Sequence, residues 1–126
     1  MYSNGYNIYK SNSVNYASKD QLLIMLVDGA VNFSKRALKA FEDQNIIEIH
    51  NNLVKVQDIF TELMVTIDRN AGEWAENMYK IYDFIKQKLF EANIKKDVKC
   101  LEEVMPLIGE VRDIWKEPYK VSKTKQ

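Results

Sequence analysis

Histidine and cysteine, the side chains that most often act in catalysis or bind metals, each occur once in this 126-residue chain, as His50 and Cys100. A Ser/His/Asp or Cys/His arrangement needs a histidine base, and a single histidine is weak material for a metal site. Helical bundles that hold two irons use paired Glu-x-x-His motifs, but Ile47 stands three residues before His50. We therefore expect His50 to be an ordinary helix histidine and the chain not to be an enzyme.

Two further features could support chemistry, and both favour a structural reading. Asp58 and Glu62 are four residues apart, so on a helix they would share one face and could form a carboxylate site. We expect that face to be a solvated helix surface. Cys100 stands next to Leu101, which favours a buried, inert thiol. The four glycines are scattered, so they form no phosphate-binding loop, and we expect neither a metal nor a cofactor.

The charge balance excludes partners that need a basic surface. Lys plus Arg and Asp plus Glu are 18 each, so the formal net charge is zero, and neither nucleic acid nor an anionic membrane would attract the chain. The longest apolar run, Leu22 to Val27, is far shorter than the roughly 20 residues that span a bilayer. One cysteine forms no intramolecular disulfide, and the N-terminus lacks the pattern of a secretory signal. We predict a cytoplasmic protein without membrane insertion.

The elements that must position these residues are helices, because apolar residues recur at spacings of three and four in four segments. Ser18 and Gln21 form a capping box, which predicts the start of the first helix. Asn45, with Glu48 three residues later, predicts the start of the second. The four apolar stripes are Leu22, Leu26, Gly29, Phe33, Ala37 and Ala40; Ile49, Leu53, Val56, Phe60, Leu63 and Ile67; Ala75, Met78, Tyr82, Ile85, Leu89 and Ala92; and Leu101, Val104, Ile108, Val111 and Trp115.

The connections between these helices are expected to be short. Residues 68–72 have turn composition, Asn93 is expected to end the third helix, and Asp97 to cap the fourth. Pro118 is expected to end the fourth helix. Pro106 lies inside it and should bend it near residues 102–105 without breaking it.

Short connections between long helices place neighbours antiparallel. The sequence therefore predicts an all-α fold, an antiparallel up-down four-helix bundle with an extended N-terminal segment. We divide the chain into an N-terminal capping segment at 1–17, the bundle at 18–117 and a flexible C-terminal tail at 118–126.

The helices carry more apolar residues than one core-facing stripe requires. The residues off the main stripes of the second and third helices are Ile46, Ile47, Val54, Ile59, Met64, Tyr79 and Phe90. A wide core explains this excess, and so does a groove that binds a partner's amphipathic helix. The first 17 residues also hold four tyrosines, and tyrosine rings can anchor a polar segment to an apolar surface.

The order of several short motifs resembles the FliS-type flagellin chaperones over nearly the whole chain, from about Tyr6 to Trp115. The motifs are Tyr9-Lys10-Ser11-Asn12-Ser13-Val14, Ala17-Ser18-Lys19-Asp20-Gln21-Leu22, Leu26-Val27-Asp28-Gly29-Ala30, Val56-Gln57-Asp58-Ile59-Phe60-Thr61-Glu62-Leu63, Ile67-Asp68, Tyr82-Asp83, Leu89, Ala92-Asn93, Glu102-Glu103-Val104 and Trp115. The chain departs from the family pattern at Val27, where an aromatic residue is usual, at the single Gly72, and at Pro106.

The resemblance implies a cytosolic export chaperone that binds the disordered C-terminal segment of flagellin, prevents premature polymerisation and aids type III flagellar secretion. Components of the flagellar export apparatus are further candidate partners. In this family the client segment wraps around the bundle, and the chaperone's N-terminal stretch covers part of the groove when free. We assign the client-binding groove to Ile59, Leu63, Tyr79 and Tyr82. The N-terminal cap is assigned to Tyr6, Ile8, Tyr9 and Val14.

Two other classes of function remain open on the sequence. The excess apolar surface also fits a structural or regulatory bundle that dimerises and has no export role. An enzyme that uses Asp58 with Glu62 is the third reading.

Overall fold

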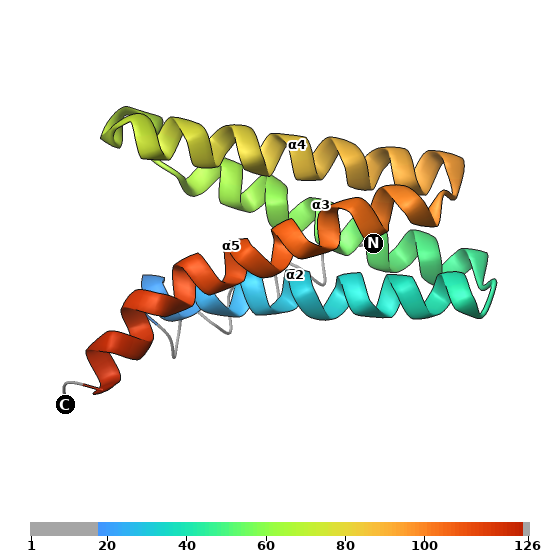
Figure 1. The fold of residues 1–126 in the computed structure, drawn as a ribbon, viewed down its shortest axis with the longest axis horizontal. Helices are drawn as coiled ribbons and strands as arrows, with labels where there is room; N and C mark the ends of the chain where they lie inside the picture. The colour runs from blue at the N-terminus through green and yellow to red at the C-terminus, as the bar shows by residue number, and fades with distance from the viewer. Residues whose placement is uncertain (1–17, 125–126) are drawn as a thin grey trace.

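The computed structural model describes residues 18–124, and all regular structure in that range is helical. Four long helices follow one another as α2 (Lys19–Glu42), α3 (Ile46–Thr66), α4 (Glu73–Lys95) and α5 (Val98–Thr124). A single 3-10 turn, η1 (Arg69–Ala71), lies between α3 and α4. The predicted all-α fold with four packed helices is confirmed, and Figure 1 shows consecutive helices running in opposite directions.

The helix starts follow the capping residues that the sequence predicts. The backbone N–H of Gln21 donates to Ser18 Oγ at 3.2 Å, and the Ser18 N–H donates to Gln21 Oε1 at 3.0 Å. Asn45 Oδ1 accepts from the N–H of Glu48 at 3.1 Å. Each contact satisfies a backbone donor that has no partner inside its helix. Both predicted helix starts are therefore confirmed.

Two predicted helix ends are wrong. Helix α4 continues past Asn93 to Lys95, where Lys96 adopts a left-handed conformation with φ of 49°. The Asn93 amide bonds His50 of α3 at 3.0 Å, so it does not compete for the helix backbone. Helix α5 continues through Pro118 to Thr124, and it is also continuous through Pro106, because a proline removes only one backbone hydrogen bond. The assignment of residues 118–126 as a flexible tail stays a prediction.

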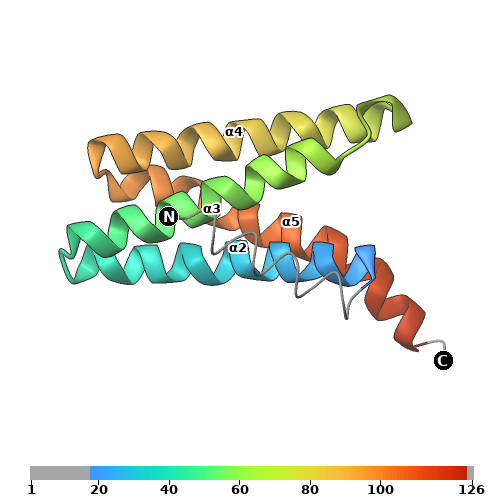
Figure 2. The same ribbon diagram turned by 180° about the vertical axis from the view of Figure 1, so that it is seen from behind.

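The helices form a ring in which each packs against two neighbours. Helix α2 packs against α3 and α5, and α4 packs against the same two helices from the opposite side. Figures 1 and 2 show α4 and α5 close together at their shared loop and moving apart toward the start of α4. The last turns of α5 project beyond the bundle (Figure 1). The α4–α5 pair is therefore the place where the ring opens.

Most residues of the predicted stripes lie in the core of the bundle. Leu22, Phe33, Ile67 and Trp115 are only half-buried, and Val27, Ala30, Val31 and Ile59 join the core from outside the stripes. Phe60, Leu53, Ile85, Leu89 and Leu101 are fully buried, each from the stripe of its own helix. Helices α2 and α3 approach closely at Gly29, where an added Cβ would lie 3.3 Å from the side chain of Ile59. A larger residue at Gly29 would push the two helices apart.

An aromatic chain of contacts crosses the bundle where α4 and α5 diverge. The ring of Tyr82 in α4 lies 5.9 Å from that of Phe60 in α3. From α5, Trp115 Nε1–H donates a 2.7 Å hydrogen bond to Tyr82 Oη. Trp74 meets the ring of Trp115 edge-on at 6.5 Å. Large rings thus fill the widening space between α4 and α5. On the other side of α5, Lys116 forms an ion pair with Asp28 of α2 at 3.0 Å.

We expect Tyr82→Phe to lower the free energy of unfolding by about 1–2 kcal/mol, because it leaves the part-buried indole N–H of Trp115 without its acceptor. Urea denaturation followed by circular dichroism measures this loss. Tyr79→Phe is the matched control, and we expect it to change stability by less than about 0.5 kcal/mol. Equal stability of the Tyr82→Phe variant and the wild type would show that this hydrogen bond does not hold α5 to α4.

Stability should also depend on pH through Tyr82. Burial raises the pKa of Tyr82 to about 12 from an ordinary value of 10.0. Its contribution is therefore fully present below about pH 10 and is lost as the pH rises toward about 12, because the unfolded state releases the phenol proton first. Over that interval the wild type should lose on the order of 2 kcal/mol more stability than Tyr82→Phe. Parallel stability profiles of the two proteins would contradict the assignment.

Candidate partner-binding surfaces

The predicted groove residues do not form one exposed surface. Leu63 and Tyr82 are each only 1% exposed, and Ile59 is 6% exposed against Gly29 of α2. Tyr79 is half-buried. The first three side chains hold the bundle together, so a partner can reach only Tyr79 without a rearrangement of the helices. Their assignment as client contacts stays a prediction, and Tyr6, Ile8, Tyr9 and Val14 lie outside the described residues.

A cation held by a carboxylate covers Tyr79. The Arg69 guanidinium lies 3.9 Å from the centre of the Tyr79 ring. The same guanidinium donates to both carboxylate oxygens of Glu76, at 3.0 Å and 2.7 Å. This hydrogen-bonded pairing lowers the pKa of Glu76 and raises the pKa of Arg69. The cluster fixes the turn between α3 and α4, and a partner that binds Tyr79 must meet or displace Arg69.

A first apolar surface lies along the outer seam of α3 and α4. We call Ile47, Phe90 and Ile94 the α3–α4 surface; all three are exposed, Ile94 to 67%. The contact between His50 and Asn93 brings the start of α3 beside the end of α4, so these residues belong to one region. Next to them is a shallow groove of about 430 Å³. Its lining residues are Gln57, Asp83, Lys86, Gln87, Phe90 and Glu91.

The apolar pattern of the sequence predicted two of the three residues of the α3–α4 surface. Ile47 and Phe90 are off-stripe residues that the sequence analysis singled out, and both are exposed. Ile94 was missed, although it follows Phe90 by four residues and therefore shares its helix face.

A second apolar surface lies along the seam of α4 and α5. We call Trp74, Ile81, Phe84 and Ile114 the α4–α5 surface; all four are exposed, Trp74 to 54%. Leu107 and Trp115 are half-buried beneath it and pack on the core. In the sequence Trp74, Ile81 and Phe84 lie beside the main apolar stripe of their helix, and we assigned them no binding role there. The signal was present in the spacing of Trp74, Ile81 and Phe84, but core-widening residues show the same spacing.

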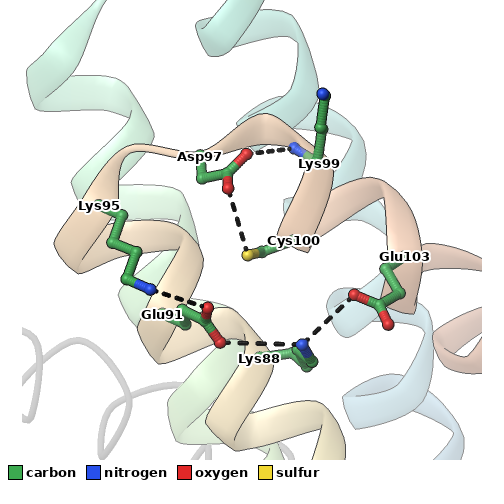
Figure 3. Close-up of polar contacts among 7 residues, drawn as sticks. All are labelled: Lys88, Glu91, Lys95, Asp97, Lys99, Cys100 and Glu103. Carbon is green, nitrogen blue, oxygen red and sulfur yellow. Dashed lines mark hydrogen bonds and ion pairs between the residues drawn. The ribbon is translucent and has the colours of Figure 1, made fainter.

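Ion pairs close this seam at the loop end (Figure 3). Lys88 Nζ lies 3.4 Å from a carboxylate oxygen of Glu103 and 3.8 Å from one of Glu91. The charge of Glu103 and the hydrogen bond to it raise the pKa of Lys88. Nearby, Cys100 is buried as expected, with its Sγ 3.7 Å from Asp97 Oδ2. Burial, followed by the charge of Asp97, raises the pKa of this thiol, so it stays protonated and unreactive.

The described part of the chain offers no other chemistry. No group of three or more His, Cys, Asp and Glu residues in it is placed to hold a metal ion. Asp58 and Glu62 are half-buried, and His50 is an exposed ring that bonds the amide of Asn93. Among residues 18–124, no helix has the length and apolar character needed to cross a bilayer.

These features define a class of protein: a four-helix bundle whose distinguishing surfaces are apolar seams between helices, as in proteins that bind other proteins. Comparison with known sequences then identifies the family. The sequence model described as "Flagellar protein FliS" matches residues 2–122. The chain belongs to the FliS family of flagellar secretion chaperones.

Curated relatives agree with this family over most of the chain. The flagellar secretion chaperone FliS of Bacillus subtilis is 38% identical over 114 residues, which cover 90% of this chain and 85% of the relative. The flagellar secretion chaperone FliS of Escherichia coli is 33% identical over 103 residues, which cover 80% of this chain and 76% of the relative. The resemblance seen in the sequence motifs is thus confirmed, and so is the prediction that the chain is not an enzyme.

Two isoleucine variants separate core from surface. We expect Ile59→Ala to lower the free energy of unfolding by about 2–4 kcal/mol, since it leaves a cavity opposite Gly29. Ile94→Ala, which removes the same atoms from an exposed side chain, should change it by less than about 0.5 kcal/mol. Chemical denaturation of both variants makes the comparison. Equal costs would mean that Ile59 is not packed against α2 in solution.

Proposed function

We propose that the protein is a cytosolic export chaperone that binds the disordered C-terminal segment of flagellin, prevents its premature polymerisation and aids type III flagellar secretion. The observation that carries this proposal is the match to the FliS family over residues 2–122. Its curated relatives are flagellar secretion chaperones. To this family membership we add flagellin as the client, its C-terminal segment as the part that binds, and the cytosol as the compartment.

The α3–α4 surface supports this proposal physically. Its exposed side chains, Ile47, Phe90 and Ile94, give an amphipathic client helix apolar contacts on the two helices to which the sequence assigns the groove. Tyr79 lies on the same side of α4 and is half-buried. A disordered segment loses conformational entropy as it folds on the bundle, which lowers its net affinity and permits release without ATP.

The N-terminal segment completes the proposal. Tyr6, Ile8, Tyr9 and Val14 would shield apolar surface in the free chaperone and move aside for the client. Burying two or three such side chains contributes roughly 3–6 kcal/mol. Ordering a dozen residues costs a similar amount, at about 1 kcal/mol or more per residue. The two nearly cancel, which is what a displaceable cap requires.

Dimerisation through an apolar seam is the second candidate function. The observation that favours it is the presence of two exposed apolar surfaces on one small bundle. Sedimentation of the pure protein over a range of concentrations tests it. A tight dimer that does not bind flagellin would replace the chaperone proposal.

Titration calorimetry with a peptide of flagellin's C-terminal segment tests the client surface. We expect Phe90→Ser with Ile94→Ser to weaken binding about tenfold or more, because each variant removes an exposed apolar anchor. Phe84→Ser, on the other side of α4, is the matched control and should leave the affinity within about twofold of wild type. Unchanged affinity in the Phe90 and Ile94 variant would move the client away from this surface. No binding by the wild type would refute the proposed function.

Deletion of residues 1–15 tests the cap. The bundle should stay folded, because its capping box begins at Ser18. The truncated protein should bind an apolar dye more strongly and self-associate at lower concentration. Client affinity should rise if the segment only competes, and fall if its tyrosines also touch the client. Unchanged dye binding, sedimentation and client affinity would show that the segment has no capping role.

A further inference from the structure

Three polar side chains join the start of α3 to the end of α4. Asn93 is only 6% exposed, and its side-chain amide nitrogen lies 3.0 Å from Nδ1 of His50. Its amide oxygen accepts a 2.7 Å hydrogen bond from Nζ of Lys96, which also donates to the backbone carbonyl of Asn93 at 2.6 Å. A buried amide thus links an exposed imidazole on one helix to an ammonium group at the end of the other.

The ammonium group of Lys96 determines which way round the amide lies. An ammonium group can only donate, so the Asn93 side-chain atom that lies 2.7 Å from it must be the oxygen. The NH2 group of the amide then faces His50, and an NH2 group also donates. Nδ1 of His50 must therefore be the acceptor, which requires a neutral ring with its proton on Nε2.

Protonation of His50 removes this acceptor. Both nitrogens of an imidazolium carry hydrogen, so Nδ1–H would meet the NH2 group of Asn93 donor to donor. The amide cannot turn over to offer its oxygen, because Lys96 holds that oxygen. If the ring swings out into solvent instead, the buried NH2 group is left without a partner. Either outcome lowers the stability of the folded chain.

Charged groups around His50 do not compensate a proton on the ring. The ring forms no ion pair with a carboxylate of residues 18–124. The ionisable side chains of α3, α2, α4 and the α4–α5 loop near it have contacts of their own: Glu48 with the Asn52 amide, Lys39 with Glu42 and Asp43, Glu91 with Lys88 and Lys95, and Asp97 with the N–H of Lys99. The charge that the network itself contributes is Lys96, which is positive and opposes a second positive charge.

We propose that His50, Asn93 and Lys96 form a pH-sensitive latch between α3 and α4, which is closed while the imidazole is neutral and is released when the ring takes up a proton. Histidine is the side chain whose charge ordinarily changes between pH 5 and 8. His50 is exposed, so protons reach it from solvent. Because the fold requires the neutral ring, the latch contributes its stability above about pH 7 and loses it as the pH falls toward about 5.

This inference goes beyond the proposed function, because it concerns the free protein and needs no client. The latch lies within the α3–α4 surface. Ile47 precedes His50 by about one helical turn, and Ile94 directly follows Asn93. Both isoleucines are exposed on the helix ends that the latch joins. Proton uptake therefore weakens the contact that fixes the spacing of these two apolar side chains.

Nitrogen NMR of the full-length chain, prepared without a histidine tag, reads the state of the ring directly, because His50 is the only histidine in the sequence. Above about pH 7 the ring should be neutral with its proton on Nε2, so Nδ1 should resonate as an unprotonated nitrogen. A proton on Nδ1, or an equal mixture of the two neutral forms, would overturn the inference.

Urea denaturation at about pH 7.5 and about pH 5.5 measures the latch against His50→Asn, whose amide oxygen can accept from Asn93 at either pH. Acidification should lower the folding equilibrium constant of the wild type about fivefold more than that of the variant, because the wild type loses a hydrogen bond to a buried donor. Carboxylates titrate in both proteins and cancel in the comparison. Equal effects of acid on the two proteins would overturn the inference.

Lys96→Met tests the role of the ammonium group. Without it, Asn93 is free to turn over and offer its oxygen to a protonated His50. In the Lys96→Met background, the effects of acid with and without His50→Asn should therefore differ by less than about twofold. Circular dichroism confirms that the variants are folded. A fivefold difference that persists without Lys96 would overturn the inference, because the pH dependence would then not pass through Asn93.

Discussion

The hydrogen bond from the Trp115 indole to the Tyr82 hydroxyl holds the bundle closed where its ring of helices is weakest. Helix α4 ends and α5 begins at a short loop, and the two helices diverge from there (Figure 1). Without a filled space between them, the far ends would expose the core layer around Phe60. A 2.7 Å bond between two large side chains, with Trp74 against the indole, fills that space and satisfies both polar groups. This contact fixes the spacing of α4 and α5 at the end of the seam that lies away from their loop.

Patterns within a single helix were enough to predict the fold, because capping and apolar periodicity are local. Ser18 and Asn45 start their helices as their residue types require, and most of the apolar stripes became the core. The predictions that Asn93 ends the third helix and Pro118 the fourth were wrong. Pro118 costs one backbone bond, which a long helix tolerates, and the Asn93 amide finds its partner in His50 on another helix.

The residues of the candidate binding surfaces were harder to predict, because the exposure of a side chain depends on what the neighbouring helix presents. Ile59 lies at the edge of its stripe, yet it is buried because Gly29 of α2 has no side chain and lets the helices approach. Leu63 and Tyr82 belong to the main stripes, and the structure keeps them there. Phe84 and Ile81 look like ordinary widening of the core stripe. Both are exposed in the folded chain, and the spacing of residues within α4 does not say how closely α5 packs beside them.

The placement of the two tryptophans gives the molecule a built-in optical reporter. Both indoles of the chain, Trp74 and Trp115, lie at the α4–α5 seam, and none lies on the α3–α4 seam. Intrinsic fluorescence excited at the indole band therefore responds to what happens on one flank of α4 and is nearly silent about the other. Because Trp74 is exposed and Trp115 packs on the core beside Tyr82, emission shifts and quenching report both contacts at the α4–α5 seam and the packing beneath it, with no label attached.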